Sequence, residues 1–363
     1  MEFCDLKAQY QAYKPEIDAA IQGVLDSSTF INGPEVKALE AELAAYAGVP
    51  QVLACANGTD ALHVALLALG AGPGDEIIVP DFTFFATAEA VALAGATPVF
   101  ADIDPETYNV TPATVADKIT GRTRGIIPVS LFGQMPDLEA IDRLARQRGL
   151  WVMEDAAQSF GASYRGRRSG SFTEIAATSF FPSKPLGCYG DGGALFVRDA
   201  GMAERLRALL NHGSLHRYRH ESVGVNSRLD SLQAAVLRVK LRHFDAELVH
   251  RQRAAARYGD RLRDRARVPV VREGHASAWA QYTLRVPDRD RVQARLAAKG
   301  IPTAVHYPIP LHAQPAFAHL KIGDDACPVA TQAAREVLSL PMHGMLAESQ
   351  IAAVCLALEE VLP

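Results

Sequence analysis

Short runs of apolar residues alternate along the chain with longer stretches in which apolar residues recur every three or four positions. The short runs predict strands, and several are apolar throughout, as buried parallel strands are. The longer stretches predict helices. We expect strands at 51–56, 76–80, 97–101, 125–129, 151–154, 177–181 and 194–197, with helices at 59–69, 83–93 and 138–148. This alternation predicts an α/β layered sheet.

The pattern differs on either side of this region. Two helices are expected before it, one from about Pro15 to Leu25 and one that starts at Pro34, a residue favoured in the first turn. A long helix is expected from about Leu229 to Tyr258. A strand at 281–286, a helix at 289–298 and a closing helix after 347 follow it. We therefore predict a large domain over residues 1–245 and a smaller α+β domain over 246–363.

Composition narrows the class of protein. The net charge of −4 argues against a nucleic-acid-binding protein, which needs a concentrated basic face. No apolar run is long enough to cross a membrane and residues 1–10 carry no signal-peptide core, so we expect a cytoplasmic protein with no membrane partner. The five cysteines are scattered, which supports neither a disulfide framework nor a zinc site. His212, His216 and His220 are spaced like a metal-binding face, but Gly213 argues against a continuous helix there, and we expect no metal.

The stretch from Ser179 to Gly193 sets Lys184 among prolines and glycines. Pro185 biases the residue before it toward extended conformations, so Lys184 is expected on a loop. A loop lysine is ordinarily a solvated charge. Whether Lys184 has a catalytic role therefore depends on which other residues lie near this loop.

A second signal is the stretch Asn57-Gly58-Thr59-Asp60-Ala61-Leu62, which follows a predicted buried strand and opens a helix. Such a turn points free N–H groups and the positive end of the helix dipole at an approaching anion. An ordinary asparagine-capped helix would have the same sequence. No G-x-G-x-x-G or Walker pattern accompanies it, so a dinucleotide or nucleoside triphosphate is not indicated.

A third signal is Glu154-Asp155-Ala156-Ala157-Gln158, at the end of an apolar strand. Ligands of open α/β sheets bind beyond the carboxyl ends of the strands. A carboxylate buried there needs a partner, which could be a salt bridge or the protonated ring nitrogen of a cofactor. Phosphate donors, an acidic partner for a pyridinium nitrogen and an amine are the groups that pyridoxal phosphate requires. Phe84 or Phe85 could cover its ring.

With these motifs together, the chain resembles the DegT or StrS-like nucleotide-sugar aminotransferases, which have the aspartate-aminotransferase fold (fold type I of the pyridoxal-phosphate enzymes). The matching segments run in order along nearly the whole chain: 5–7, 57–62, 154–158, 179–184, 224–230 and 306–308. The resemblance implies a mixed, mostly parallel sheet in the large domain. It also implies roles for individual residues: Lys184 as the Schiff-base lysine, Asp155 on the pyridine nitrogen, Gln158 on the ring hydroxyl, Gly58, Thr59 and Ser179 on the phosphate, Asn226 reaching it from a neighbouring subunit, and Phe84 stacked on the ring.

Segments 128–134 and 306–311 resemble the subgroup that aminates carbon 3 of a UDP-linked keto N-acetylhexosaminuronic acid, on the route to bacterial surface polysaccharides such as O-antigen. The resemblance implies a homodimer with shared active sites, an amino-acid donor such as glutamate, and pyridoxal 5′-phosphate alternating with pyridoxamine 5′-phosphate. Arg228, His306 and Tyr307 are the candidates for contacts with the substrate. Two alternatives stay open: an aminotransferase for a 4-keto dTDP- or UDP-hexose, and a non-catalytic regulatory protein that binds the cofactor. Relatives that remove a sugar hydroxyl carry histidine in place of Lys184.

Overall fold

The computed structural model describes residues 1–216, 218–323 and 325–362. Its centre is a seven-stranded sheet with the order β1-β9-β8-β5-β4-β2-β3, in which β9 runs antiparallel to both of its neighbours and the other pairs are parallel. The strands are β1 (Gln51–Cys55), β2 (Glu76–Pro80), β3 (Thr97–Ala101), β4 (Thr123–Ile126), β5 (Trp151–Asp155), β8 (Ile175–Ser179) and β9 (Gly193–Val197). The predicted mixed, mostly parallel sheet is confirmed.

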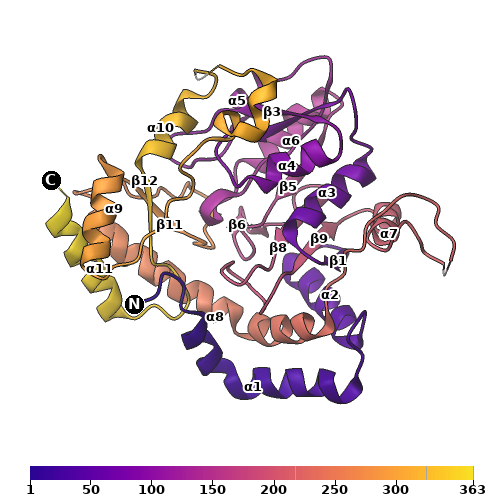
Figure 1. Ribbon diagram of the computed structural model, residues 1–363, viewed down its shortest axis with the longest axis horizontal. Coiled ribbons are helices and arrows are strands. Elements are labelled where there is room, and N and C mark those ends of the chain that lie inside the picture. Colours follow the sequence, from indigo (N-terminus) through magenta and orange to yellow (C-terminus); the bar gives the residue numbers. More distant parts are fainter. Residues whose placement is uncertain (217, 324, 363) are drawn as a thin grey trace.

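Helices cover both faces of this sheet because the strands bury alternate residues on opposite sides. In β1, Leu53 packs in one core cluster and Val52 in another. The first cluster receives α3 (Gly58–Leu69), α4 (Ala86–Leu93) and α7 (Ala200–Leu209). The other face receives α2 (Pro34–Ala47), α6 (Leu138–Gln147) and the start of α8 (Ser231–Leu262). The result is the three-layer arrangement visible in Figure 1.

The first helix is longer than its sequence pattern suggests. Helix α1 spans Leu6–Ser27 and is capped by Asp5, whose carboxylate accepts the Ala8 N–H at 2.8 Å. Pro15, expected near the start of the helix, lies inside it. An internal proline costs a helix about 3 kcal/mol. Packing of α1 along α8, where Ile17 is buried, offsets that cost (Figure 1).

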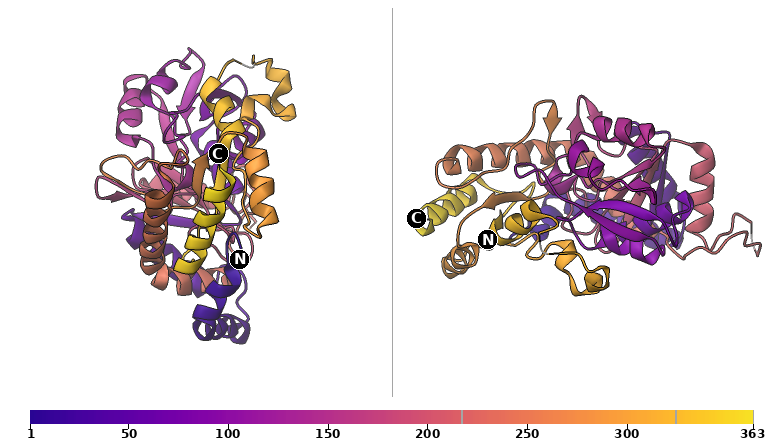
Figure 2. Two further views of the ribbon diagram at one scale, coloured as in Figure 1. Left: turned by 90° about the vertical axis from the view of Figure 1, so that its left-hand side faces the viewer. Right: turned by 90° about the horizontal axis from the view of Figure 1, so that it is seen from above.

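A second core lies at the far end of α8. It forms between β11 (Tyr282–Arg285), β12 (Val337–Leu340), α9 (Arg289–Ala298) and α11 (Glu348–Val361), which Figure 2 shows beside that end of the long helix. The predicted domain boundary at 245 falls within α8, which continues through both cores. Helix α10 (Pro328–Glu336) packs in the core of the large sheet. The division at 245 therefore stays a prediction.

The remaining elements are short and were not expected from the hydrophobic pattern: α5 (Pro112–Ala116), β6 (Ser163–Tyr164), β7 (Arg167–Arg168), β10 (His275–Ala276) and three 3-10 turns at 131–133, 311–313 and 315–320. Among the described residues, no helix is both long and apolar enough to cross a lipid bilayer.

Candidate active site

Lys184 lies on the loop that joins β8 to β9, as the flanking prolines predict. The Lys184 N–H donates to the Phe181 carbonyl at 2.8 Å, and the Cys188 N–H donates to the Phe180 carbonyl at 2.8 Å, so the loop closes on itself. Gly187 is required here because a Cβ at that position would lie 2.5 Å from the Pro182 carbonyl oxygen. Burial lowers the pKa of the Lys184 amine, and the nearby Asp155 carboxylate opposes this shift. The loop thus holds an amine whose charged form is disfavoured by burial.

Asp155 ends β5 at the carboxyl edge of the sheet and is 4% exposed. Its Oδ2 accepts the hydroxyl of Thr87 at 2.8 Å and its Oδ1 accepts the Ala157 N–H at 3.1 Å. Burial raises the pKa of the carboxyl, while the Thr87 and Ala157 hydrogen bonds and the charge of Lys184 oppose the rise. Burial therefore destabilises the charges of both Asp155 and Lys184. A cationic ring nitrogen next to Asp155 would restore its ionised form.

The start of α3 approaches the end of β8 very closely. The Asn57 side chain caps the helix by accepting the Asp60 N–H at 2.8 Å, which leaves the first N–H groups, those of Gly58 and Thr59, without an acceptor in the described part of the chain. A Cβ on Gly58 would lie 2.8 Å from the Cβ of Ser179. Helix N-H groups and a serine hydroxyl therefore meet at one point, which suits a phosphate. The predicted phosphate residues Gly58, Thr59 and Ser179 are brought together.

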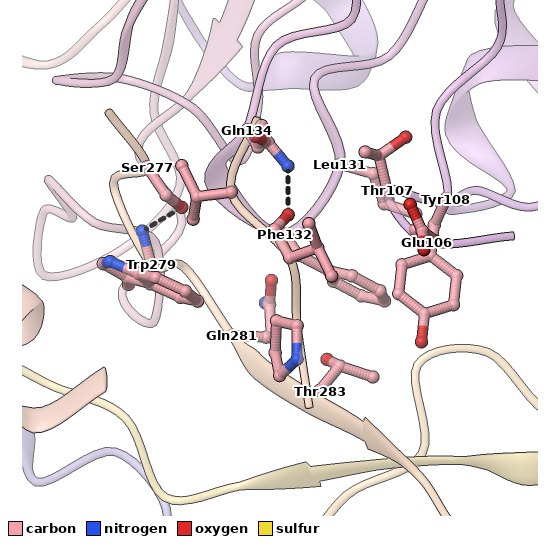
Figure 3. A pocket seen from close by; sticks show the side chains of 13 residues that line it. Glu106, Thr107, Tyr108, Leu131, Phe132, Gln134, Ser277, Trp279, Gln281 and Thr283 are labelled. Atoms are coloured by element: carbon pink, nitrogen blue, oxygen red, sulfur yellow. Dashed lines mark hydrogen bonds between the residues drawn. The ribbon is translucent and has the colours of Figure 1, made fainter. Parts of the chain in front are cut away.

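Gln158 bridges two parts of the site. Its Oε1 accepts the Phe132 N–H at 2.7 Å and its Nε2 donates to the Tyr307 hydroxyl at 2.9 Å. Phe132 has a φ of 56°, a left-handed conformation that is uncommon outside glycine, and it lies in a turn beside a cavity of about 20 Å³ (Figure 3). Gln158 thereby fixes Tyr307 beside the end of β5.

The structure separates the two candidate ring-stacking residues. Phe85 packs on Phe317, 5.3 Å between ring centroids, at the edge of the main core. Phe84 is 54% exposed and its ring lies 6.0 Å from that of Tyr307. Phe84 is therefore the more accessible of the two rings, and its stacking on a cofactor stays a prediction.

His306 lies next to Tyr307 on the same segment. Its Nδ1 is 2.9 Å from the Ser339 hydroxyl, and its ring is 6.0 Å from that of Phe3. Burial, and then the charge of Lys184, lower the pKa of His306 to about 4. The imidazole is thus neutral near pH 7 and acts as a hydrogen-bonding group.

In the described part of the chain, neither Asn226 nor Arg228 forms a hydrogen bond with Lys184, and Asp155 is the charged group that acts on the Lys184 amine. Arg228 lines a cavity of about 280 Å³ with Lys37 of α2 and Arg207 of α7, and Asn226 is exposed. The loop after α7 that leads to these residues extends away from the body of the protein in two views (Figures 1 and 2). Their predicted roles would require a second chain.

These groups fit pyridoxal phosphate: a cradle at Gly58 that a Cβ would fill, a buried carboxylate at Asp155 and a half-buried amine at Lys184. Two contributors were not found from the sequence. Thr87, in the first turn of α4, orients Asp155 through its hydroxyl. Gly193 is needed because a Cβ there would lie 2.5 Å from the Asn57 carbonyl. The glycine-rich end of the stretch 179–193 could have indicated Gly193. No local motif in the sequence marks Thr87 as a contributor to the site.

Gly58→Ala tests the phosphate cradle. The added methyl group must displace Ser179 or the start of α3, so we expect the dissociation constant for pyridoxal phosphate to rise roughly tenfold or more, equivalent to about 1.4 kcal/mol. Titration of the cofactor-free protein, followed by absorbance, measures it. Gly72→Ala is the matched control, since a Cβ there meets no atom within 4 Å. Equal affinity in both variants would contradict the cradle.

Comparison with known proteins gives matches over the whole chain. The sequence model of the DegT/DnrJ/EryC1/StrS aminotransferase family matches residues 11–359. A UDP-2-acetamido-2-deoxy-3-oxo-D-glucuronate aminotransferase of Pseudomonas aeruginosa is 53% identical, over 99% of this chain and 99% of that protein. A UDP-N-acetyl-3-dehydro-alpha-D-glucosamine 3-aminotransferase of Acidithiobacillus ferrooxidans is 46% identical, over 99% of this chain and 97% of that protein.

Solved structures agree with these sequence matches. DesV of S. venezuelae, in complex with a ketimine intermediate, superposes with a TM-score of 0.97 at 44% identity, covering 99% of this chain and 97% of that chain. NtdA of Bacillus subtilis, with its cofactor pyridoxamine phosphate bound, gives a TM-score of 0.93 at 29% identity, covering 99% of this chain and 85% of that chain. The fold class predicted from the sequence is confirmed.

Proposed function

Because this chain belongs to the DegT/DnrJ/EryC1/StrS aminotransferase family, we propose that it transfers an amino group to carbon 3 of a UDP-linked 2-acetamido-3-oxo-hexuronic acid. The family makes it a pyridoxal-phosphate-dependent aminotransferase of nucleotide sugars, in which the cofactor alternates with pyridoxamine phosphate. The observation that carries the choice of substrate is the 53% identity, over nearly the full length, to an enzyme named for the 3-oxo-glucuronate. Glutamate is the proposed amino donor.

Each side chain of the site has a separate role in the proposed reaction. When bound, pyridoxal phosphate supplies a ring that accepts the electron pair left when the donor's α-carbon loses its proton. Asp155 holds a proton on the ring nitrogen, and Lys184 Nζ takes up and returns the proton that moves. Gly58, Thr59 and Ser179 anchor the phosphate. Gln158, oriented by the Phe132 N–H and the Tyr307 hydroxyl, is placed to meet the ring hydroxyl.

Recognition of the uronate carboxylate is assigned to Arg228 and His306. A guanidinium binds a carboxylate through paired N–H groups and keeps its charge at any physiological pH. His306 contributes a neutral hydrogen bond, since its pKa is lowered to about 4. Arg228 forms no hydrogen bond with Lys184 in the described part of its own chain, and we propose that it acts on the substrate held by a second subunit.

We propose a homodimer with shared active sites, in which Asn226 and Arg228 reach the site of the partner subunit. The loop that leads to Asn226 extends away from the body of the protein, and apolar side chains that a partner could cover, Phe30, Ile31, Leu215 and Val223, are 43–92% exposed. We place the enzyme in the cytoplasm, in the synthesis of surface polysaccharide such as O-antigen, where UDP-sugars are its substrates.

The substrate proposal is tested by comparing the UDP-linked 3-oxo-uronate with UDP-N-acetyl-3-dehydro-glucosamine, the matched neutral sugar. We expect kcat/KM to favour the uronate by roughly 10- to 150-fold, the effect of about 1.5–3 kcal/mol from a charged hydrogen bond. Arg228→Met should remove most of this preference while it leaves the neutral sugar nearly unaffected. Equal efficiency of the two sugars with the native enzyme would refute recognition of the carboxylate.

A further inference from the structure

A second small cavity, of about 10 Å³, lies behind the Lys184 loop. Its walls come from three distant parts of the chain: the N-terminal segment with Asp5 and Gln9, the loop with Lys184, and the pair Arg251 of α8 and His343. The proposed role of Lys184 in binding the cofactor and moving a proton does not require Asp5, Gln9, Arg251 or His343. The matching segment 5–7 at the N-terminus likewise has no role in the site described above.

The polar groups that line this cavity are buried and incompletely hydrogen-bonded. Of the eight buried side-chain nitrogen and oxygen atoms without a partner in the described part of the chain, four belong to Gln9, Arg251 and His343. They are Gln9 Oε1, Arg251 Nε and both ring nitrogens of His343. Arg251 and His343 are only 3% and 4% exposed. Burying such atoms without a partner is costly, so each calls for an explanation.

The neighbouring contacts fix which of these atoms donate and which accept. Gln9 Nε2 donates to both oxygens of Glu247, at 2.8 and 3.0 Å, which leaves Gln9 Oε1 as an acceptor toward the cavity. Arg251 Nη1 donates to the Trp279 carbonyl at 2.9 Å, whereas Nε is buried and has no acceptor among the described residues. Burial, then the charge of Arg251, lower the pKa of His343 to about 4, so its neutral ring offers one donor and one acceptor.

Water satisfies this set of groups better than an ion does. A water molecule can donate to Gln9 Oε1 and to the bare nitrogen of His343 while it accepts from Arg251 Nε. An anion has no hydrogen to donate to Gln9 Oε1. A carboxylate is also too large, because a cavity of about 10 Å³ holds one water molecule. The positive charge of Arg251 already interacts with the negative charge of the Glu247 carboxylate, so the cavity need not hold an anion to balance it.

We propose that this cavity holds one water molecule next to Lys184 and supplies it to the hydrolytic step of transamination, an inference that rests on the proposed function. In that step the bond between the α-carbon of the amino donor and the nitrogen carried by the cofactor must break. The water oxygen becomes the carbonyl oxygen of the oxo acid as the carbon–nitrogen bond breaks, and both water hydrogens end on the nitrogen. The second half-reaction releases one water in return. Gln9, Arg251 and His343 are thus positioning residues for this water.

The first test is crystallographic and needs no turnover. At high resolution, the native protein with or without cofactor should show a single water within hydrogen-bonding distance of Gln9 Oε1 and Arg251 Nε, as the contact range of about 2.7–3.2 Å requires. Gln9→Met, which keeps the size of the side chain but removes both the acceptor and the amide that donates to Glu247, should lose it. A chloride ion there, or no density in the native protein, would overturn the proposal.

The second test separates hydrolysis from proton transfer. In a single turnover with α-deuterated L-glutamate, Gln9→Met and His343→Leu should form oxo acid roughly 10- to 100-fold more slowly, the range expected for a misplaced reactant. Their deuterium isotope effect should shrink, and recovered glutamate should lose deuterium to solvent, because proton transfer then becomes reversible before hydrolysis.

Gln281→Met is the matched control, since Gln281 Oε1 is also buried without a partner but lines the separate cavity of Figure 3. A slower reaction with an unchanged isotope effect, or the same change in Gln281→Met, would mean general loss of structure and refute the role of the water. If the native enzyme failed to react with any amino acid, the aminotransferase assignment itself would fail, and the crystallographic test would still decide whether the water is present.

Discussion

Replacing Lys184 with alanine is expected to abolish turnover and to remove the covalent link to the cofactor that borohydride traps. The loop offers this one amine beside Asp155, and no hydroxyl or imidazole can replace it as both nucleophile and proton carrier. Loss of the acid–base role alone lowers rates by about 10²–10⁴-fold. Steady-state assays and the mass of the intact protein after borohydride reduction measure the two effects.

Two other lysines make this experiment specific. Lys299 is exposed and paired with Glu360, so Lys299→Ala should retain both activity and labelling. Lys240 is buried under the same loop, where its amine donates to the Gly187 carbonyl at 2.6 Å, and burial lowers its pKa to about 8. Peptide mapping must therefore place the label on Lys184. Full activity in Lys184→Ala, or a native label on Lys240, would refute the assignment.

The sheet was predictable because its strands are short apolar runs that need no distant partner to be recognised. β2 and β3 were expected at 76–80 and 97–101 and are observed at Glu76–Pro80 and Thr97–Ala101. β4 was expected at 125–129 and lies at Thr123–Ile126, because the polar Thr123 pairs with Glu76 of β2 and Arg124 lies at an irregularity of the register between Thr123 and Gly125. Errors of this kind arise where tertiary packing outweighs local preference, as it does at Pro15 in α1.

The chemical groups of the site were predictable only where they lie in local motifs. Lys184, Asp155 and Gly58 each sit in a turn or strand end whose sequence shows its shape. The segment that carries Tyr307 is placed by a contact that the sequence does not reveal. Asp81, directly after β2, accepts the N–H of His312 at 2.8 Å and lies 2.6 Å from its Nδ1, across 231 positions of sequence. This buried pair fixes segment 306–312 over the sheet edge.

Asp155→Asn is expected to slow removal of the donor's α-proton by roughly 10²–10³-fold, the effect of losing about 2.7–4 kcal/mol of preorganised electrostatic stabilisation. Asparagine keeps the size of the side chain and can still accept the Thr87 hydroxyl, which now bonds Asp155 Oδ2 at 2.8 Å. It cannot hold a proton on the cofactor's ring nitrogen, because it carries no negative charge. Exchange of the α-deuteron of glutamate into solvent, followed by NMR at saturating cofactor, measures the rate.

Thr87→Val separates the charge of Asp155 from its orientation. That variant removes the hydroxyl from Oδ2 but leaves the Ala157 N–H on Oδ1 at 3.1 Å, so Asp155 keeps its charge and one of its two hydrogen bonds. We expect a loss of roughly tenfold, as for one hydrogen bond to a charged group. A rate in Asp155→Asn equal to that of the native enzyme, with the cofactor bound in both, would show that the ring nitrogen has no need of this carboxylate. Equal losses in the two variants would assign the effect to geometry, because only one of them removes the charge.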